Sequence, residues 1–348
     1  MLQRLHPVAS VDAPDQPFLA RGVTVAVPAT CANLGPGFDC VALALDMRNV
    51  FEVSLLPREG GTGACQVEVA PASADQPAPP SIETGDDNLF CQAFALLCAR
   101  QGVTPPALRV RIVVEIPPSR GLGSSATAVV GGLLAANTLL GQPYSAAELV
   151  ELAIECEPGR HADNVAAALL GGLVVTGARD GDASIVSLSL PVPESLRAVV
   201  FIPDMPMSTV AGRALLPERY ARGDVAFNLS RLALLLGALQ VGRFDALAAA
   251  MDDRVHQPYR EKLFPALRPL MAAACEAGAH GACLSGGGSA VLALVSDNAE
   301  QVRAELARAA QALQVAGRCV IAGVSRQGAA ATLSGEPLGR AQTERGIA

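Results

Sequence analysis

A glycine-rich turn between a strand-like and a helix-like segment constrains the fold of this chain more than any other feature. Leu108–Ile116 alternates over nine residues, which indicates a half-buried strand, and Pro117–Pro118 ends it. Gly121–Ser125 then leads into an apolar, helix-like run that ends at Gly141. Free N–H groups in the first helical turn, close backbone approach at the glycines and the helix dipole all favour an anion. The sequence therefore predicts a phosphate-binding turn, although a lone G-x-G is more often an ordinary turn capped by serine.

This turn lacks the lysine that many phosphate loops carry. A Walker loop needs G-x-x-x-x-G-K-[ST] and a protein kinase needs a lysine on a strand, but the only lysine of the chain is Lys262. Both classes are thereby nearly excluded. Backbone N–H groups, the helix N-terminus, two serines and a divalent cation would have to share the phosphate charge.

Charge, hydropathy and cysteine content exclude several other classes. The formal net charge of −7 argues against a nucleic-acid surface, because phosphate neutralisation needs clustered cations and the arginines form no dense run. No apolar run approaches the length that crosses a bilayer, and the first 20 residues do not resemble a signal peptide, so no membrane association is expected. The nine cysteines form no C-x-x-C pair, which indicates reduced thiols in a cytoplasmic protein.

A chain of 348 residues is too long for one typical core, so two domains are expected. Strands dominate before Pro191–Pro193 and helices after it, which favours an α+β protein with its boundary there over a doubly wound parallel sheet. The expected division is a flexible tail at 1–21, domains at 22–192 and 193–328, and a flexible tail at 329–348. The expected strands are Val23–Val27, Val50–Leu55, Ala64–Val69, Leu108–Ile116, Gly172–Thr176, Ala198–Ile202 and Ala290–Val295. The expected helices are Asn88–Gln101, Ser124–Leu140, Ser145–Glu157, Asp163–Leu170, Thr209–Leu215, Asp224–Leu239, Phe244–Met251, Leu263–Ala277 and Ala299–Leu313.

Three blocks of sequence together resemble one family. PPSRGLGSSAT at Pro117–Thr127 is similar to the phosphate-binding motif of the GHMP kinases, which phosphorylate small molecules with ATP. PATCANLGPGFDCVALAL at Pro28–Leu45 and GACLSGGGSAVLAL at Gly281–Leu294 resemble two further motifs, in the family's order, and the likeness spans about residues 22–325. The resemblance implies a two-domain GHMP kinase fold, with an N-terminal domain like ribosomal protein S5 and a C-terminal α/β sandwich domain. It also implies ATP binding by Pro117, Pro118, Ser119, Arg120, Gly121, Leu122, Gly123, Ser124, Ser125, Ala126 and Thr127.

Within this family, the details most resemble the members that phosphorylate L-homoserine. The first block departs from theirs only at Cys31, and HADN at His161–Asn164, STVAGRALLP from Ser208 and HQPYREKLFP from His256 are similar to their later elements. The resemblance implies transfer of the ATP γ-phosphate to the homoserine side-chain hydroxyl, a step towards threonine, and a homodimer. Two alternatives stay open: another acceptor, such as mevalonate, a sugar or a shikimate-like alcohol, and a non-catalytic binding protein of the same fold.

The resemblance also implies roles for individual residues. Arg213 and Arg260 would bind the carboxylate of the acceptor, since a planar guanidinium suits two oxygens, and Asp39 would accept hydrogen bonds from its ammonium group. The other implied substrate contacts are Asn33, His161 and Thr209. An isolated arginine is more often a solvated charge, and Asp39 could instead cap a helix through Leu45.

Catalysis in such a site depends mainly on positioning and on charge stabilisation. Asn164 is expected to orient the attacking hydroxyl, and Asp163 is the candidate if a base exists. Mg²⁺ would need one carboxylate besides the Ser125 hydroxyl and phosphate oxygens. Glu155 is the preferred carboxylate, with Glu151 and Glu157 as competitors on the same expected helix. Glu151 and Glu155 share a helical face, which could equally be an exposed acidic stripe.

Overall fold

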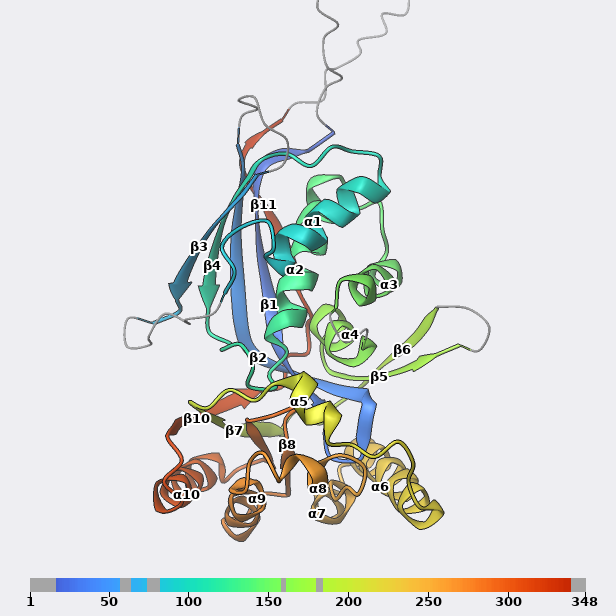
Figure 1. Cartoon of the computed structure of the whole chain (residues 1–348), viewed down its shortest axis with the longest axis vertical. Helices are drawn as coiled ribbons and strands as arrows, with labels where there is room; N and C mark the ends of the chain where they lie inside the picture. Colours follow the sequence, from blue (N-terminus) through green and yellow to red (C-terminus); the bar gives the residue numbers. More distant parts are fainter. Residues whose placement is uncertain (1–16, 57–63, 74–81, 158–160, 180–183, 339–348) are drawn as a thin grey trace, which may run out of the picture.

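The computed structural model describes residues 17–56, 64–73, 82–157, 161–179 and 184–338. Within these residues the chain forms a 7-stranded and a 4-stranded sheet, each covered by helices (Figure 1). Among the described strands every pair is antiparallel except β3 with β4, which lies at the edge of the first sheet. This arrangement confirms the α+β class and excludes a doubly wound parallel sheet.

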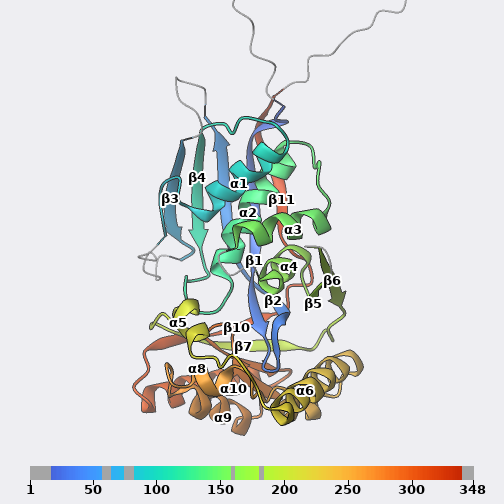
Figure 2. The same cartoon turned by 45° about the vertical axis from the view of Figure 1, so that its right-hand side comes forward.

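The first sheet is built on two long antiparallel strands, β1 and β2, whose shared turn reaches the second domain (Figures 1 and 2). Val23, Val25 and Val27 of β1 are buried against the covering helices, as period-two alternation requires. The strands of this sheet are β1 (Ala20–Asn33), β2 (Gly37–Leu55), β3 (Cys65–Pro71), β4 (Leu108–Val114), β5 (Leu173–Ala178), β6 (Ile185–Leu190) and β11 (Ala330–Pro337). The helices over it are α1 (Leu89–Arg100), α2 (Ser124–Leu139), α3 (Ala146–Cys156) and α4 (Ala162–Leu170).

The second sheet separates two apolar cores. Val199 and Phe201 of β7 face the α9 and α10 side, while Ala198 and Val200 face the lower part of the β1–β2 pair. The core on the Ala198 and Val200 face also contains residues of β1 and β2, so the two domains share it. The strands are β7 (Arg197–Pro203), β8 (Gly281–Leu284), β9 (Val291–Val295) and β10 (Gly317–Gly323). The helices of this domain are α5 (Thr209–Ala214), α6 (Arg222–Val241), α7 (Leu247–Ala250), α8 (Gln257–Arg260), α9 (Leu267–Glu276) and α10 (Ala299–Ala312), with a short 3₁₀ helix η1 (Phe244–Ala246).

Three chain segments differ from the sequence-based expectation. Residues 329–348 were expected to be a tail, but β11 pairs antiparallel with β1 and so returns the chain to the first sheet. As an exposed edge strand, β11 lacks the alternation that marks a half-buried strand. β1 begins at Ala20, inside the expected N-terminal tail, whose residues 1–16 lie outside the described part. Asp39 belongs to β2, so the alternative of a helix through Leu45 is wrong.

The cysteines are not all reduced thiols. Cys65 on β3 and Cys91 on α1 form a disulfide, with 6.3 Å between their Cα atoms. No C-x-x-C spacing announces this pair, because 26 residues separate the partners and the sheet brings them together. The other seven cysteines are free thiols.

Among the residues that the structure describes, one helix has the length and composition of a membrane span, contrary to the expectation that no apolar run would approach that length. α6 has a mean hydropathy of 1.3 over an 18-residue window, of which 22% is buried. Its buried residues Asn228, Leu235, Ala238 and Leu239 face the second domain. Length and composition alone are weak evidence of spanning.

Candidate active site

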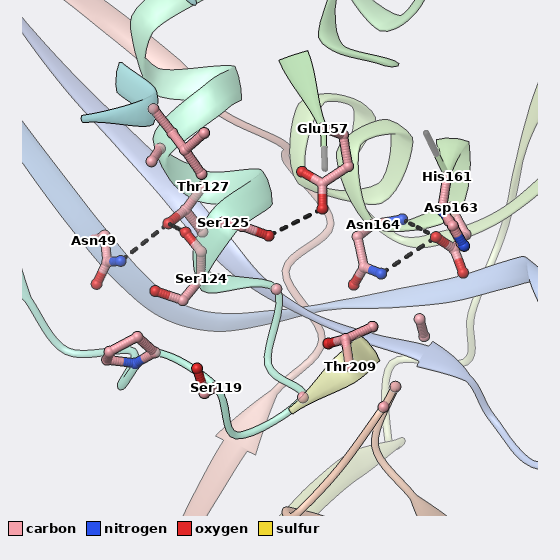
Figure 3. Close-up of a pocket in the computed structure, with 18 of the residues that line it drawn as sticks. Asn49, Ser119, Ser124, Ser125, Thr127, Glu157, His161, Asp163, Asn164 and Thr209 are labelled. Carbon is pink, nitrogen blue, oxygen red and sulfur yellow. Dashed lines mark hydrogen bonds between the residues drawn. The ribbon is translucent and has the colours of Figure 1, made fainter. Parts of the chain in front are cut away.

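A cavity of about 570 Å³ is lined by residues of both domains. Residues at the N-terminal ends of α2 and α4, at the start of α5 and at the end of α8 line it, and those of α2, α4 and α5 are labelled in Figure 3. The three blocks that resemble GHMP kinase motifs therefore meet at one place, although they are far apart in the sequence.

The phosphate turn, residues 117–127, enters α2 through two glycines in the left-handed region. Gly121 has φ +76° and Gly123, the N-cap of α2, has φ +70°. A Cβ on Gly121 would lie 2.1 Å from the Ser285 carbonyl oxygen, and one on Gly123 would lie 2.0 Å from Thr30 Oγ1. Glycine is thus needed here for close packing of the neighbouring motifs, and not only for approach of a ligand, as the sequence suggested.

No side chain caps the start of α2, and its first turn carries no acidic residue. The first N–H groups therefore remain available to an anion, and the helix dipole favours one. The Ser119, Ser124 and Ser125 side chains are drawn around this end of the cavity in Figure 3. This geometry supports the predicted phosphate-binding turn.

Not every residue of the turn reaches the cavity. Pro118, Ser119, Gly121, Gly123, Ser124, Ser125 and Thr127 line it, whereas Pro117, Arg120, Leu122 and Ala126 do not. Arg120 donates hydrogen bonds to the carbonyl oxygens of Pro118 and Pro203, at 2.9 and 3.2 Å, and to that of Asp204. Its guanidinium fastens the turn to the second domain, so the expected ATP contact of Arg120 is replaced by a structural one.

The carboxylate beside Ser125 belongs to Glu157, which corrects the preference for Glu155. Glu155 lies on the outside of α3 and forms an ion pair with Arg100 at 2.5 Å. α3 ends at Cys156, and the extended backbone of Glu157 turns its side chain into the cavity, where Ser125 Oγ donates to Glu157 Oε1 at 3.0 Å (Figure 3). Glu151 is exposed like Glu155, so these two form the acidic outer stripe.

Glu157 has the features of a metal ligand. Its Oε2 atom is buried and has no hydrogen-bond partner among the described residues. Burial raises the pKa of the Glu157 carboxyl, while the Ser125 hydrogen bond lowers it. A cation between Glu157 and Ser125 would satisfy the unpaired oxygen and offset the cost of burying the charge.

Asp163 and Asn164 begin α4 in the middle of the cavity. Asp163 is buried, and burial raises its pKa to about 7, assisted by the nearby Asp39 charge. Asn164 donates to Asp163 Oδ1 from its backbone N–H at 2.7 Å and from its side chain at 3.2 Å (Figure 3). Thr30 Oγ1 in turn donates to Asn164 Oδ1 at 2.7 Å. The orientation of the Asn164 amide is thus set by both neighbours.

Asp39 and Arg213 form a two-point ion pair at the far end of the cavity. Arg213 Nη1 lies 3.1 Å from Asp39 Oδ2, and Nη2 lies 2.5 Å from Oδ1. Asp39 has φ +59°, and its N–H donates to Asn33 Oδ1 at 3.1 Å. His161 Nε2 is 3.7 Å from Asp39 Oδ1, and burial lowers the His161 pKa. A ligand that carries both a carboxylate and an ammonium group would pair with Arg213 and Asp39 in place of their pair with each other.

Arg260 is the second guanidinium at this end and is only 1% exposed. Its Nη1 atom donates to the Gly286 carbonyl oxygen and to His256 Nδ1, both at 3.0 Å. Burial, with the Arg213 charge, lowers the Arg260 pKa to about 10. Asn33 Nδ2 also donates to the Gly286 oxygen, at 2.9 Å, and Thr209 lines the cavity at the start of α5 (Figure 3). All six predicted substrate residues, Asn33, Asp39, His161, Thr209, Arg213 and Arg260, therefore line one cavity.

Sequence reasoning missed several residues of the site. Thr30 stands within the first motif, where its position beside Asn33 could have marked it. Phe51, Ile82, Leu89 and Ile112 form an apolar wall beyond the phosphate turn, and Asn49 donates to Thr127 Oγ1 at 3.0 Å there. No local pattern distinguishes these side chains from ordinary core residues.

Comparison with known proteins gives a consistent family. The models "GHMP kinases N terminal domain" and "GHMP kinases C terminal" match residues 88–172 and 235–312. The chain is 43% identical to a homoserine kinase of Trichormus variabilis over 79% of this chain and 87% of that one. It is 42% identical to a homoserine kinase of a Synechococcus species, over 88% and 96% of the two chains.

Solved structures agree with these relatives. The structure is similar to homoserine kinase from Cytophaga hutchinsonii, with a TM-score of 0.79, 25% identity, and coverage of 90% of this chain and 98% of that one. A mevalonate kinase structure has a TM-score of 0.63 at 14% identity, with coverage of 87% of this chain and 99% of that one. At that identity the likeness concerns the fold alone.

Proposed function

This chain belongs to the GHMP kinase family, and from that premise we propose that it transfers the γ-phosphate of ATP to the side-chain hydroxyl of L-homoserine. The product is O-phospho-L-homoserine. The observation that carries the proposal is that Arg213, Arg260 and Asp39 line the same cavity as the phosphate turn. One site can thus bind a zwitterion and a nucleotide phosphate side by side.

The charges at the far end suit an amino acid. The two guanidinium groups would bind the α-carboxylate, and Asp39 would accept from the α-ammonium group. Binding would exchange the Asp39–Arg213 ion pair for two pairs with the substrate, so neither charge would lose its partner. The hydroxyl of homoserine would extend from this end towards Asn164 and the phosphate turn, where the phosphate is transferred.

The other end suits ATP. Its phosphates would bind the free N–H groups at the start of α2 and the hydroxyls of Ser124 and Ser125. The apolar wall of Phe51, Ile82, Leu89 and Ile112 would accommodate the base. A nucleotide in this orientation would present its γ-phosphate to the middle of the cavity.

We also propose Mg²⁺ as the cofactor, held by Glu157 and Ser125. The unpaired Oε2 atom of Glu157 supports this, because a buried carboxylate oxygen needs a hydrogen bond or a cation. When bound, the ion would neutralise phosphate charge in place of the absent lysine. The single carboxylate is sufficient, since Mg²⁺ commonly keeps waters and binds substrate phosphates.

The chain's own residues then orient the hydroxyl and receive its proton. The Asn164 amide, held by Asp163 and Thr30, is placed to hold the hydroxyl in line with the phosphate. Asp163, with a pKa of about 7, can accept the proton near neutral pH. Phosphoryl transfer asks little of a base, so positioning provides most of the rate enhancement.

The test is ADP release with Mg·ATP and a panel of homoserine, mevalonate, galactose and shikimate. We expect robust turnover with homoserine alone. Equal or greater turnover with mevalonate or galactose would refute the assignment and favour another acceptor. No turnover with any of the four, despite ATP binding, would favour a non-catalytic protein of the same fold.

We further propose that the enzyme acts in the cytoplasm, where ATP is available, with small molecules as its partners and no nucleic acid or membrane. A homodimer is proposed from the family resemblance. Sedimentation equilibrium at several protein concentrations would test the dimer, and a single species of monomer mass would contradict it.

A further inference from the structure

Two guanidinium groups that face one small anion repel each other, so something must hold them together before the substrate arrives. The ring of Phe38 lies against both. The Cζ atoms of Arg213 and Arg260 are 5.1 and 5.5 Å from its centroid. Each distance is within the range of a cation–π contact, so one ring attracts both cations.

His256 contacts both the Phe38 ring and the Arg260 guanidinium. Its imidazole stacks on Phe38 with the ring centroids 5.4 Å apart and the planes 27° from parallel. His256 Nε2 lies 2.7 Å from the Gly35 carbonyl oxygen, which can only accept, so Nε2 carries the proton. Nδ1 is then a lone-pair acceptor, and Arg260 Nη1 donates to it at 3.0 Å.

We propose that Phe38 and His256 are positioning residues that hold the guanidinium groups of Arg213 and Arg260 ready for the substrate carboxylate. This inference rests on the proposed phosphorylation of homoserine. Neither residue lines the cavity, so each acts through the arginines without touching the substrate. Phe38 comes from the β1–β2 strand pair and His256 from the residue before α8, so the pair joins the two domains at the carboxylate site.

The surroundings fix both rings in place. Asp253 accepts from the backbone N–H groups of His256 and Gln257, at 2.9 and 2.6 Å, and so anchors the start of α8. Gly35, at φ +88°, packs so closely that a Cβ would lie 2.2 Å from the Met251 carbonyl oxygen. Burial lowers the His256 pKa to about 4, which keeps the imidazole neutral and its Nδ1 able to accept from Arg260.

Phe38 is tested by two variants that separate its π face from its bulk. Phe38→Leu keeps an apolar side chain but removes the ring, and we expect the homoserine KM to rise about tenfold while kcat and the ATP KM change less than about twofold. Phe38→Tyr keeps the ring and should restore the wild-type homoserine KM. The role of Phe38 would be overturned if the homoserine KM of Phe38→Leu stays at the wild-type value. An equal rise in the homoserine KM and the ATP KM would overturn it as well.

Phe244 and His280 provide a matched control. They form another phenylalanine–histidine pair, 4.8 Å between centroids, and neither lines the cavity. Phe244→Leu should leave both KM values unchanged. A rise of the homoserine KM in Phe244→Leu as large as in Phe38→Leu would show a general packing effect and overturn the proposal.

His256 offers a second test that does not depend on Phe38. Asparagine places an acceptor near the Nδ1 position, towards Arg260, whereas glutamine places a donor near the Nε2 position, towards Gly35. We expect His256→Gln to raise the homoserine KM several-fold more than His256→Asn. Melting temperatures are measured alongside, because both variants disturb a buried residue.

The outcomes separate a positioning role from a structural one. The role of His256 would be overturned if the homoserine KM is equal in the two His256 variants. It would also be overturned if the homoserine KM follows the melting temperature instead of the retained acceptor. Failure of the proposed function itself is distinguishable, because the wild-type enzyme would then not turn over homoserine at all.

Discussion

The two ends of the cavity bind charge in different ways. The phosphate end is made from backbone N–H groups, serine hydroxyls and glycines, with the Glu157 carboxylate beside Ser125. The arginine end is made from long charged side chains, Arg213 and Arg260, which need an ion pair, a ring and a buried histidine to hold them. A backbone site is fixed once its turn is folded, whereas a side-chain site depends on what packs around it.

The two ends should therefore tolerate substitution differently. A Cβ added at the phosphate end displaces the backbone itself. A side chain removed at the arginine end weakens one interaction and leaves the rest of the site in place.

Gly123→Ala should abolish turnover, with kcat/KM about 1,000-fold or more below the wild type. The new Cβ would lie 2.0 Å from Thr30 Oγ1 and displace both the phosphate turn and the Thr30–Asn164 hydrogen bond. Gly242→Ala is the matched control, because Gly242 has the same φ of +70° but nothing lies within 4 Å of its Cβ position. Both variants lose stability through the left-handed conformation, by about 1–2 kcal/mol.

The measurement is ATP-analogue binding by calorimetry, with ADP release on the same samples. A folded Gly123→Ala variant with wild-type nucleotide affinity and turnover would contradict the role of the glycine. Gly242→Ala should bind and turn over normally.

Glu157→Gln should lower kcat about 100-fold, because it removes the one charged ligand proposed for Mg²⁺. It should also raise the Mg²⁺ concentration needed for half-maximal rate. Glu155→Gln is the control, since Glu155 pairs with Arg100 on the outside of α3. Titration of activity with MgCl₂ compares the two, and a larger defect in Glu155→Gln would return the metal site to Glu155.

The phosphate end was largely predictable from the sequence. Strand alternation, the proline stop and the glycine–serine helix start are local signals, and each predicted its element. Glu157 was not preferred over Glu155, because the choice depends on where α3 ends, and helix boundaries are among the least certain features of a sequence. The expected helix runs to Glu157 whereas α3 ends at Cys156, and this one-residue difference decides that the Glu157 carboxylate faces the cavity.

The arginine end was predicted only through family resemblance. Arg213 and Arg260 lie on short helices of six and four residues, with no spacing that distinguishes them from surface arginines. Phe38 and His256 meet through a contact between the domains, which no local pattern encodes. The same holds for β11 and for the Cys65–Cys91 disulfide, which depend on pairing between distant segments.

Arg213→Ala should lower kcat/KM about 30- to 100-fold, mainly through the homoserine KM, with the ATP KM nearly unchanged. Arg243→Ala is a close control, because Arg243 also forms a two-point pair with an aspartate, Asp245, at 2.8 Å for both contacts, but on the exposed surface. Steady-state kinetics with each substrate varied in turn provide the measurement. An unchanged homoserine KM in Arg213→Ala would remove Arg213 from the substrate site.

The smallest expected effect concerns Asp163, which lies between the two ends. Its pKa is raised to about 7, so the carboxyl is mostly protonated below that pH and can accept a proton only above it. If Asp163 receives the hydroxyl proton, kcat/KM should fall as pH drops through 7, by about tenfold between pH 8 and pH 6. Asp163→Asn should remove this limb while keeping part of the activity, because positioning by Asn164 and the phosphate turn would persist.

A wild-type profile that is flat from pH 8 to pH 6, or a limb that survives in Asp163→Asn, would show that the proton leaves by another route. Binding of homoserine would neutralise both Asp39, which raises the Asp163 pKa, and Arg213, which lowers it; because the Asp39 effect is the larger, the Asp163 pKa should fall. We therefore expect the apparent pKa in kcat to lie below that in kcat/KM, and this ordering ties the chemistry at the centre of the cavity to the charges at its arginine end.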